Sequence, residues 1–136
     1  MVRHQELQLW VEEMAAMCKP ERIVWINGSE EEHQRLTAEA ISSGEVIQLD
    51  SEKWPGCLYH RTALNDVART EDLTFICTTL KDDAGPTNNW MSPEEGYRRA
   101  GEIFEGAMRG RTMYVIPFCM GPVGSPFSKI GVELTD

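Results

Sequence analysis

The sequence predicts an α/β or α+β domain in which helices flank a mixed sheet. Stretches with helical periodicity alternate with short β-branched runs along the 136 residues, in the order helix, strand, helix, short strands, strand, helix and two strands. Hydrophobic residues make up 41% of the chain, which is enough for a protein of this length to bury a core. No internal repeat or low-complexity linker interrupts this order, so we expect one folded portion over residues 1–136.

The first two elements are predicted from spacing and composition. Apolar residues recur at helical spacing from Leu7 to Cys18, which predicts an amphipathic helix over about residues 4–18 that Pro20 helps to end. Residues 22–26 (RIVWI) are rich in β-branched side chains and are expected to form a short, buried strand.

A capping box predicts where the second helix begins. Ser29 can cap it, Glu32 stands three residues later, and Gly44 is suited to its C-terminal end. Residues 46–49 (VIQL) and 57–61 (CLYHR) then resemble short strands joined by a turn.

Residues 73–79 (LTFICTT) form another β-branched run and predict a strand. Residues 81–90 (KDDAGPTNNW) combine charges, Gly-Pro and paired asparagines, which is typical of an ordered loop rather than a regular element.

A second capping box precedes the last predicted helix. Ser92 is its cap, Pro93 its first residue, and Glu95 stands three residues after the cap. The apolar face of this helix is expected to consist of Tyr97, Ala100, Phe104 and Met108.

Residues 112–118 (TMYVIPF) and 129–134 (KIGVEL) are the last two predicted strands.

Charge and composition exclude several classes of function. A net charge of −9 argues against a general nucleic-acid or acidic-membrane binder. No stretch approaches the roughly 20 apolar residues of a membrane span, and glutamates within the N-terminal apolar pattern argue against a signal peptide. The cysteines form no CxxC pair and are expected to be reduced thiols in a cytoplasmic protein; they are Cys18, Cys57, Cys77 and Cys119.

The glycine- and proline-rich stretch after residues 112–118 has two interpretations. A strand that leads into Gly121-Pro-Val-Gly124 could cradle a phosphate, but no lysine follows the glycines at the spacing of a phosphate-binding loop. Pro122 and Pro126 also remove two amide donors. We therefore favour a rigid connection between strands.

Two other patterns predict no site. Cys57 and His60 have half of a zinc spacing, but residues three apart on a strand point to opposite faces. Cys119 follows a strand at a place where a nucleophile can lie, yet nothing local would lower its pKa. We predict no catalytic residue and no metal ligand from these patterns.

The stretch NDVARTED, residues 65–72, places Arg69 among Asp66, Glu71 and Asp72 just before a predicted strand. One interpretation is a surface ion-pair cluster of little energetic value. The other is a guanidinium held by neighbouring carboxylates and presented to an anionic ligand. The local pattern by itself favours the first.

Three segments carry a resemblance to a known family. DVARTED with Thr62 upstream, the loop AGPTNNWM, and the run MRGRTMYVIPFCMGPVGSPFSKIGVELTD resemble the N-terminal part of GTP-dependent phosphoenolpyruvate carboxykinase. The likeness extends from CKPERIVWINGSEEE to the last residue. One departure is Ala63-Leu64, where the family commonly has Asp-Pro.

The resemblance implies a function and two site residues. Enzymes of this family interconvert oxaloacetate and phosphoenolpyruvate in gluconeogenesis, with GTP as phosphoryl donor and Mn²⁺ or Mg²⁺ as metal. By this resemblance Arg69 contacts the anionic substrate, and Glu71 contacts the closed active-site lid.

The resemblance also implies what residues 1–136 lack. The family's metal ligands, cysteine-bearing phosphate loop and guanine pocket lie beyond this portion, so we expect a substrate-side N-terminal part that is inactive alone and binds neither GTP nor metal. Its last strand is expected to be an exposed edge capable of association. The alternative is a free-standing anion-binding or regulatory module derived from that domain.

Overall fold

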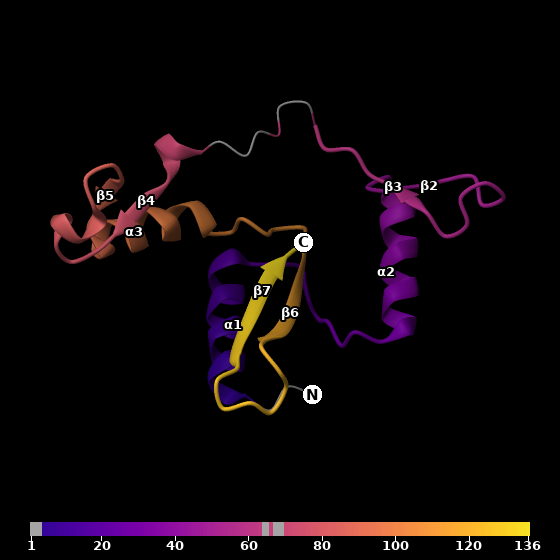
Figure 1. The fold of residues 1–136 in the computed structure, drawn as a ribbon, viewed down its shortest axis with the longest axis horizontal. Coiled ribbons are helices and arrows are strands. Elements are labelled where there is room, and N and C mark those ends of the chain that lie inside the picture. The colour runs from indigo at the N-terminus through magenta and orange to yellow at the C-terminus, as the bar shows by residue number, and fades with distance from the viewer. Residues whose placement is uncertain (1–3, 64–65, 67–69) are drawn as a thin grey trace. The chain divides into compact units, whose positions relative to one another are not determined.

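The computed structural model describes residues 4–63, 66 and 70–136 of the chain. By their internal contacts the residues divide into two compact units. Met1–Ile26 and Thr74–Asp136 form one, here called the sheet unit, and Asn27–Leu73 form the other, here called the α2 unit. Figure 1 labels the helices and strands of both units.

The sheet unit is built on a mixed sheet, as predicted. In the described part of the chain its strands are β1 (Arg22–Trp25), β6 (Thr112–Met120) and β7 (Lys129–Thr135), in the order β1-β6-β7. β1 runs parallel to β6, and β6 is antiparallel to β7. The two strands predicted at the end of the chain are therefore confirmed, and they pair as a hairpin.

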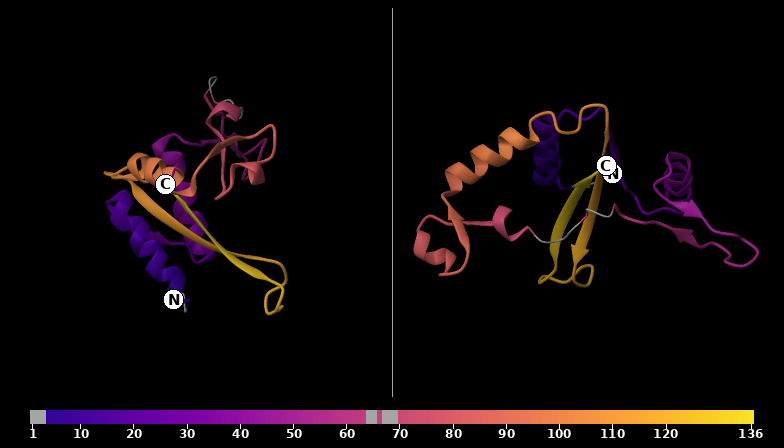
Figure 2. Two further views of the ribbon diagram at one scale, coloured as in Figure 1. Left: turned by 90° about the vertical axis from the view of Figure 1, so that its left-hand side faces the viewer. Right: turned by 90° about the horizontal axis from the view of Figure 1, so that it is seen from above.

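Helix α1 (Gln5–Cys18) supplies the other layer of the core. It lies beside the β6–β7 hairpin in the left-hand view of Figure 2. Val11 of the helix is 2% exposed, and Met113 and Val115 of β6 are fully buried. Burial of each such side chain contributes about 1.5–3 kcal/mol, so this small cluster holds the helix on the sheet.

The predicted first helix is confirmed and the predicted burial of the first strand is wrong. The His4 side chain accepts a hydrogen bond from the backbone N–H of Leu7, and Lys19 ends α1 in the left-handed conformation at φ 56°. Ile23 of β1 is 45% exposed. β1 pairs with β6 alone among the described strands, so it is an edge strand, and Val24 and Trp25 are only half-buried.

The predicted loop at residues 81–90 contains regular structure that composition does not indicate. Lys81–Ala84 form the 3₁₀ helix η2, and Asn89–Met91 form the strand β5. β5 pairs in parallel with β4 (Phe75–Cys77), the ordered core of the strand predicted at residues 73–79. A strand of three residues is too short to show periodicity in the sequence. Its conformation depends on pairing with β4.

Helix α3 (Pro93–Phe104) begins as predicted but does not bury the predicted face. Ser92 accepts a hydrogen bond from the backbone N–H of Glu95 at 3.2 Å. Tyr97 is 83% exposed and Phe104 is 50% exposed. No residue of α3 is buried, because little of the described chain packs against it.

The α2 unit contains α2 (Glu30–Ser43), the antiparallel pair β2 (Ile47–Gln48) and β3 (Leu58–Tyr59), and the 3₁₀ helix η1 (Glu71–Leu73). The predicted helix and both short strands are confirmed. Gly44 ends α2 in the left-handed conformation at φ 84°, where glycine carries no steric penalty.

The predicted capping box forms, but the carboxylate of Glu32 accepts hydrogen bonds from residues that precede Ser29. Ser29 accepts from the Glu32 N–H as expected, at 3.2 Å. The Glu32 carboxylate, however, accepts from the N–H groups of Asn27 and Gly28 at 2.7 and 2.9 Å, and the Ser29 N–H donates to Asn27 Oδ1 instead. The carboxylate therefore fixes the loop before the helix as well as its first turn.

Candidate functional site

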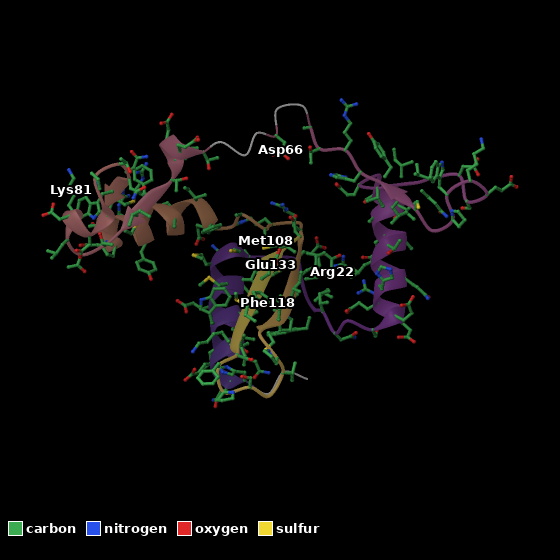
Figure 3. All side chains as sticks on the ribbon, in the orientation of Figure 1. Arg22, Asp66, Lys81, Met108, Phe118 and Glu133 are labelled. Carbon is green, nitrogen blue, oxygen red and sulfur yellow. The ribbon has the colours of Figure 1, made fainter. Side chains whose placement is uncertain are left out.

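The segment predicted to bind the anionic substrate lies between β3 and η1. Arg69 lies outside the described residues, so its expected contacts with carboxylates stay a prediction. Figure 3 labels Asp66, whose backbone N–H donates to the carbonyl of Ala63 at 3.0 Å. Glu71 opens η1, in which the Leu73 N–H donates to the Thr70 carbonyl at 2.9 Å. Exposed carboxylates therefore stand within three residues of Arg69 on both sides in the sequence.

The loop AGPTNNWM is firmly anchored in the sheet unit. Trp90 Nε1 donates to the backbone carbonyl and to the hydroxyl of Thr78, both at 3.1 Å. Asn88 Nδ2 donates to the Ala84 carbonyl at 2.6 Å, and Ala84 is 5% exposed. The paired asparagines and the tryptophan therefore order this loop by hydrogen bonds to the backbone.

The glycine- and proline-rich stretch after β6 is a connection between strands, as we favoured. It joins β6 to β7 through successive turns, with Ser125 N donating to Pro122 O at 3.1 Å and Ser128 N donating to Ser125 O at 3.2 Å. Ser128 Oγ donates to the Pro122 carbonyl at 2.6 Å. Gly121 has φ 112°, which explains the choice of glycine where the chain leaves β6.

The described residues do not fit a metal ion. They contain no group of three or more histidine, cysteine, aspartate or glutamate side chains that could hold one. His60 Nδ1 lies 2.6 Å from the Glu45 carbonyl, and Cys57 Sγ lies 3.8 Å from the Pro55 carbonyl. Cys119 Sγ lies 3.6 Å from the Gly121 carbonyl and is exposed. These side chains have local backbone partners instead.

Two hollows lie along α1 in the sheet unit. The first has a volume of about 530 Å³ and is lined by α1, the end of α3, and the ends of the hairpin. The second has a volume of about 460 Å³ and is lined by α1 and by β7 with Ser128 before it. Trp10 lines both. The sequence analysis did not find them, although the methionines of the predicted helix face were a possible signal.

Two ion pairs flank the first hollow. Lys19 pairs with Glu105, whose pKa the lysine lowers by its hydrogen bond and its charge. Arg111 pairs with Asp136, which raises the pKa of the arginine. Desolvation, with a smaller contribution from Glu105, raises the pKa of the Cys18 thiol, so this cysteine is a packing residue of the core. In the described part of the chain no helix has the length and apolar character that a membrane span requires.

Comparison with known proteins gives one consistent result. Residues 9–136 match the family model for the phosphoenolpyruvate carboxykinase N-terminal domain. The chain is 59% identical over 127 residues, 93% of its length, to "Phosphoenolpyruvate carboxykinase [GTP]" of Anaeromyxobacter sp. (strain K). It is 50% identical over 135 residues to the protein of that name from Chlamydia caviae, and 46% identical over 134 residues to the one from Corynebacterium jeikeium.

The chain spans about a fifth of the length of these relatives, 21% to 22% in each case. The matched model is that of an N-terminal domain, and it covers almost all of the sequence, including both described units. The chain belongs to the phosphoenolpyruvate carboxykinase family and matches the N-terminal domain of that family.

Proposed function

We propose that this chain provides the N-terminal, substrate-side part of a GTP-dependent phosphoenolpyruvate carboxykinase. Such an enzyme decarboxylates oxaloacetate to an enolate, to which GTP then transfers a phosphoryl group to give phosphoenolpyruvate. The observation that carries this proposal is the 59% identity over 93% of the chain to a protein named for that activity. The reaction develops negative charge on the substrate, so cationic side chains contribute to its rate.

Arg69 is the substrate-binding residue in this proposal. A guanidinium donates two parallel hydrogen bonds to a carboxylate or phosphate, which fixes the orientation of the anion as well as its position. Asp66 and Asp72 flank it in the sequence and are exposed. A local guanidinium between carboxylates can bind a small anion even in a chain with a net charge of −9.

Glu71 is proposed to contact the active-site lid when the lid closes over the substrate. It begins η1 (Glu71–Leu73), a single turn at the end of the α2 unit, and it is exposed. Ordering an exposed glutamate side chain costs up to about 1.5–2 kcal/mol of conformational entropy, which hydrogen bonds to the closing segment would have to offset.

GTP and the divalent metal are proposed to bind to the rest of the family enzyme rather than to these residues. The described residues lack a group of three side chains suitable for a metal. The glycines after β6 form a strand connection with two prolines rather than a phosphate cradle. The role of this chain is therefore to bind and orient the substrate anion.

The activity test uses the purified chain with phosphoenolpyruvate, bicarbonate, GDP and Mn²⁺. We expect no carboxylation, because GTP and the metal are proposed to bind to the rest of the family enzyme. Carboxylation that depends on GDP and Mn²⁺ would show that the proposed division of roles is wrong.

The binding test separates the substrate-side portion from its rival, an independent anion-binding or regulatory module. Calorimetry with phosphoenolpyruvate and with oxalate would compare the wild-type chain, Arg69→Ala, and the control Arg61→Ala, an exposed arginine of the same connecting segment. For a portion that needs the rest of the enzyme we expect no binding by any of them. Binding lost only in Arg69→Ala would favour the module.

The edge strand β7 and the cellular location complete the proposal. β7 pairs with β6 alone among the described strands, so one row of its N–H and C=O groups is available for association with another chain. Sedimentation at increasing concentration tests the association, and a chain that stays monomeric would contradict it.

We propose a cytoplasmic protein, supported by four cysteines that are all free.

A further inference from the structure

The pair Asn27-Gly28 stands at the start of the α2 unit, of which Asn27 is the first residue. Glycine follows Asn27 in the sequence, whereas larger residues follow Asn65, Asn88 and Asn89. Asn27 and Gly28 are both exposed. An asparagine side-chain amide is chemically labile, and glycine, which has no Cβ, leaves its own backbone nitrogen open to approach. The pair therefore has the composition of a deamidation site.

Deamidation of such a pair is an intramolecular reaction. The backbone nitrogen of Gly28 gives its proton to hydroxide and attacks Cγ of Asn27. The bond from Cγ to the side-chain nitrogen breaks, and this nitrogen takes a proton from water and leaves as ammonia. Water then opens the succinimide ring at either carbonyl, which gives aspartate or isoaspartate. Because the reacting atoms belong to neighbouring residues, the reaction needs no reactant besides water.

Glu32 holds the nucleophile of this reaction. The Gly28 N–H donates to Glu32 Oε2 at 2.9 Å, and the Asn27 N–H donates to the same oxygen at 2.7 Å. Loss of the Gly28 proton would break the first of these bonds and place a second negative charge beside the carboxylate, which like-charge repulsion disfavours. Glu32 is 8% exposed, so water has little access to replace its bonds in the folded chain.

The hydrogen bonds of the pair also oppose ring closure. Closure rotates the Cα–C bond of Asn27 until the Gly28 nitrogen eclipses Cβ. The two nitrogens bound to Glu32 are the ends of this torsion, so the rotation pulls at least one of them away from the shared carboxylate oxygen. Asn27 Oδ1, on the carbon that is attacked, accepts from the Ser29 N–H at 2.7 Å, which restricts the side chain as well.

The reaction products would not restore this arrangement. Isoaspartate adds one methylene to the main chain between Cα of residue 27 and the Gly28 nitrogen, so the two N–H groups can no longer share one oxygen. Aspartate keeps the main chain but adds a carboxylate next to Glu32, whose Oε2 lies 2.7 Å from the backbone nitrogen of Asn27, and like charges repel. Deamidation would therefore loosen the start of α2 irreversibly.

We propose that Asn27 is a latent site of spontaneous modification, which Glu32 protects by binding the backbone nitrogens of Asn27 and Gly28. The pair reacts only when these hydrogen bonds open, so its rate of deamidation follows the local stability at the start of α2. This inference concerns the α2 unit alone and is independent of the enzymatic role proposed above.

The rate is measured by incubating the purified chain at mildly alkaline pH, with peptide mass spectrometry that separates aspartate from isoaspartate. A synthetic peptide of residues 24–31, which lacks Glu32, gives the rate of the unprotected pair. We expect the wild-type chain to react at least about fivefold more slowly than the peptide. Asn88, whose Nδ2 donates to the Ala84 carbonyl, serves as an internal reference that should not respond to changes at Glu32.

The variant Glu32→Ala should deamidate about 5- to 30-fold faster than Glu31→Ala, because it loses two hydrogen bonds to a charged group. Glu31→Ala removes the same charge from an exposed position of the same helical turn. Glu32→Gln keeps an oxygen that can accept both bonds but loses the charge, so its rate should lie between those of the wild type and Glu32→Ala. Equal rates in Glu32→Ala and Glu31→Ala would overturn the proposal.

Ser29→Ala separates protection by Glu32 from general fraying of the helix. This substitution removes the hydroxyl that accepts from the Glu32 N–H, so it weakens the cap, but it leaves both bonds from the carboxylate to Asn27 and Gly28. It should therefore accelerate deamidation less than Glu32→Ala does, and circular dichroism compares the helix content of the two variants. Equal acceleration by Ser29→Ala, or a wild-type chain that reacts as fast as the peptide, would also overturn the proposal.

Discussion

The carboxylate of Glu32 is predicted to stabilise the start of the α2 unit by about 1–2 kcal/mol. It is 8% exposed and accepts hydrogen bonds from Asn27 N at 2.7 Å and Gly28 N at 2.9 Å. A hydrogen bond to a charged group contributes about 1.5–3 kcal/mol. The sum for two bonds is reduced here, because Asn27 and Gly28 are exposed and water replaces the lost acceptor in Glu32→Ala. The ion pair with Arg35 adds little, because its N–O distance is 4.0 Å and the arginine side chain is exposed.

Glu31→Ala is the matched control for this substitution. Both variants remove one negative charge from the first turn of α2 and introduce the same helix-forming residue, but Glu31 is exposed. The difference between them therefore reports the two hydrogen bonds, free of the helix-dipole contribution of about 0.3–1 kcal/mol.

Native-state hydrogen exchange measures this difference at the amides of α2 and of the loop before it. A loss of 1–2 kcal/mol corresponds to about a 5- to 30-fold loss of protection in Glu32→Ala relative to Glu31→Ala. Equal protection in the two variants would refute the assigned role of the carboxylate and leave Ser29 as the whole cap.

Two further predictions concern the sheet unit. A Cβ at Gly131 would overlap Cζ of Phe118, its cross-strand partner. Gly131→Ala should therefore displace the ring and destabilise the hairpin by about 0.2–1 kcal/mol, the value of one cross-strand side-chain pair. In a Phe118→Ala background the same change should be neutral or stabilising, and urea unfolding that shows the same sign in both backgrounds would contradict this. Lys19 lowers the pKa of Glu105 in the folded chain, so this pair's contribution is present above the unfolded pKa of about 4.3 and is lost as the pH falls through the lower folded value. Between pH 5 and 3 wild type should therefore lose more stability than Glu105→Gln, and parallel pH profiles would show that the pair contributes nothing.

Local signals predicted the elements that local interactions form. The helix starts at Ser29 and Ser92 were predictable because each hydroxyl accepts from an N–H three residues later in the sequence. The β6–β7 hairpin was predictable because long apolar runs flank a stretch of glycine and proline. The strand β5 was missed because Asn89–Met91 become a strand only by pairing with β4, which precedes them by a whole loop.

Local sequence patterns indicated less about the candidate site than about the helices and strands. The role proposed for Arg69 rests on resemblance to a family, because its local pattern of charges also fits an ordinary surface cluster. The two hollows along α1 were missed for another reason. Trp10 and Met14 have the spacing of a core-facing helix stripe, and sequence periodicity cannot distinguish a stripe that meets the sheet from one that remains open.

The same distinction explains why α3 misled the sequence analysis. Its apolar positions predicted a buried face, yet Tyr97 and Phe104 are 83% and 50% exposed. The spacing of apolar residues shows which side chains share a helix face. In the described residues this face of α3 remains largely exposed. The packing around a helix, which periodicity does not report, therefore decides how far such a face is covered. The same limit is visible between neighbours on α1, where Val11 is 2% exposed and Trp10 is 41% exposed, because only the side of the helix that faces the sheet is covered.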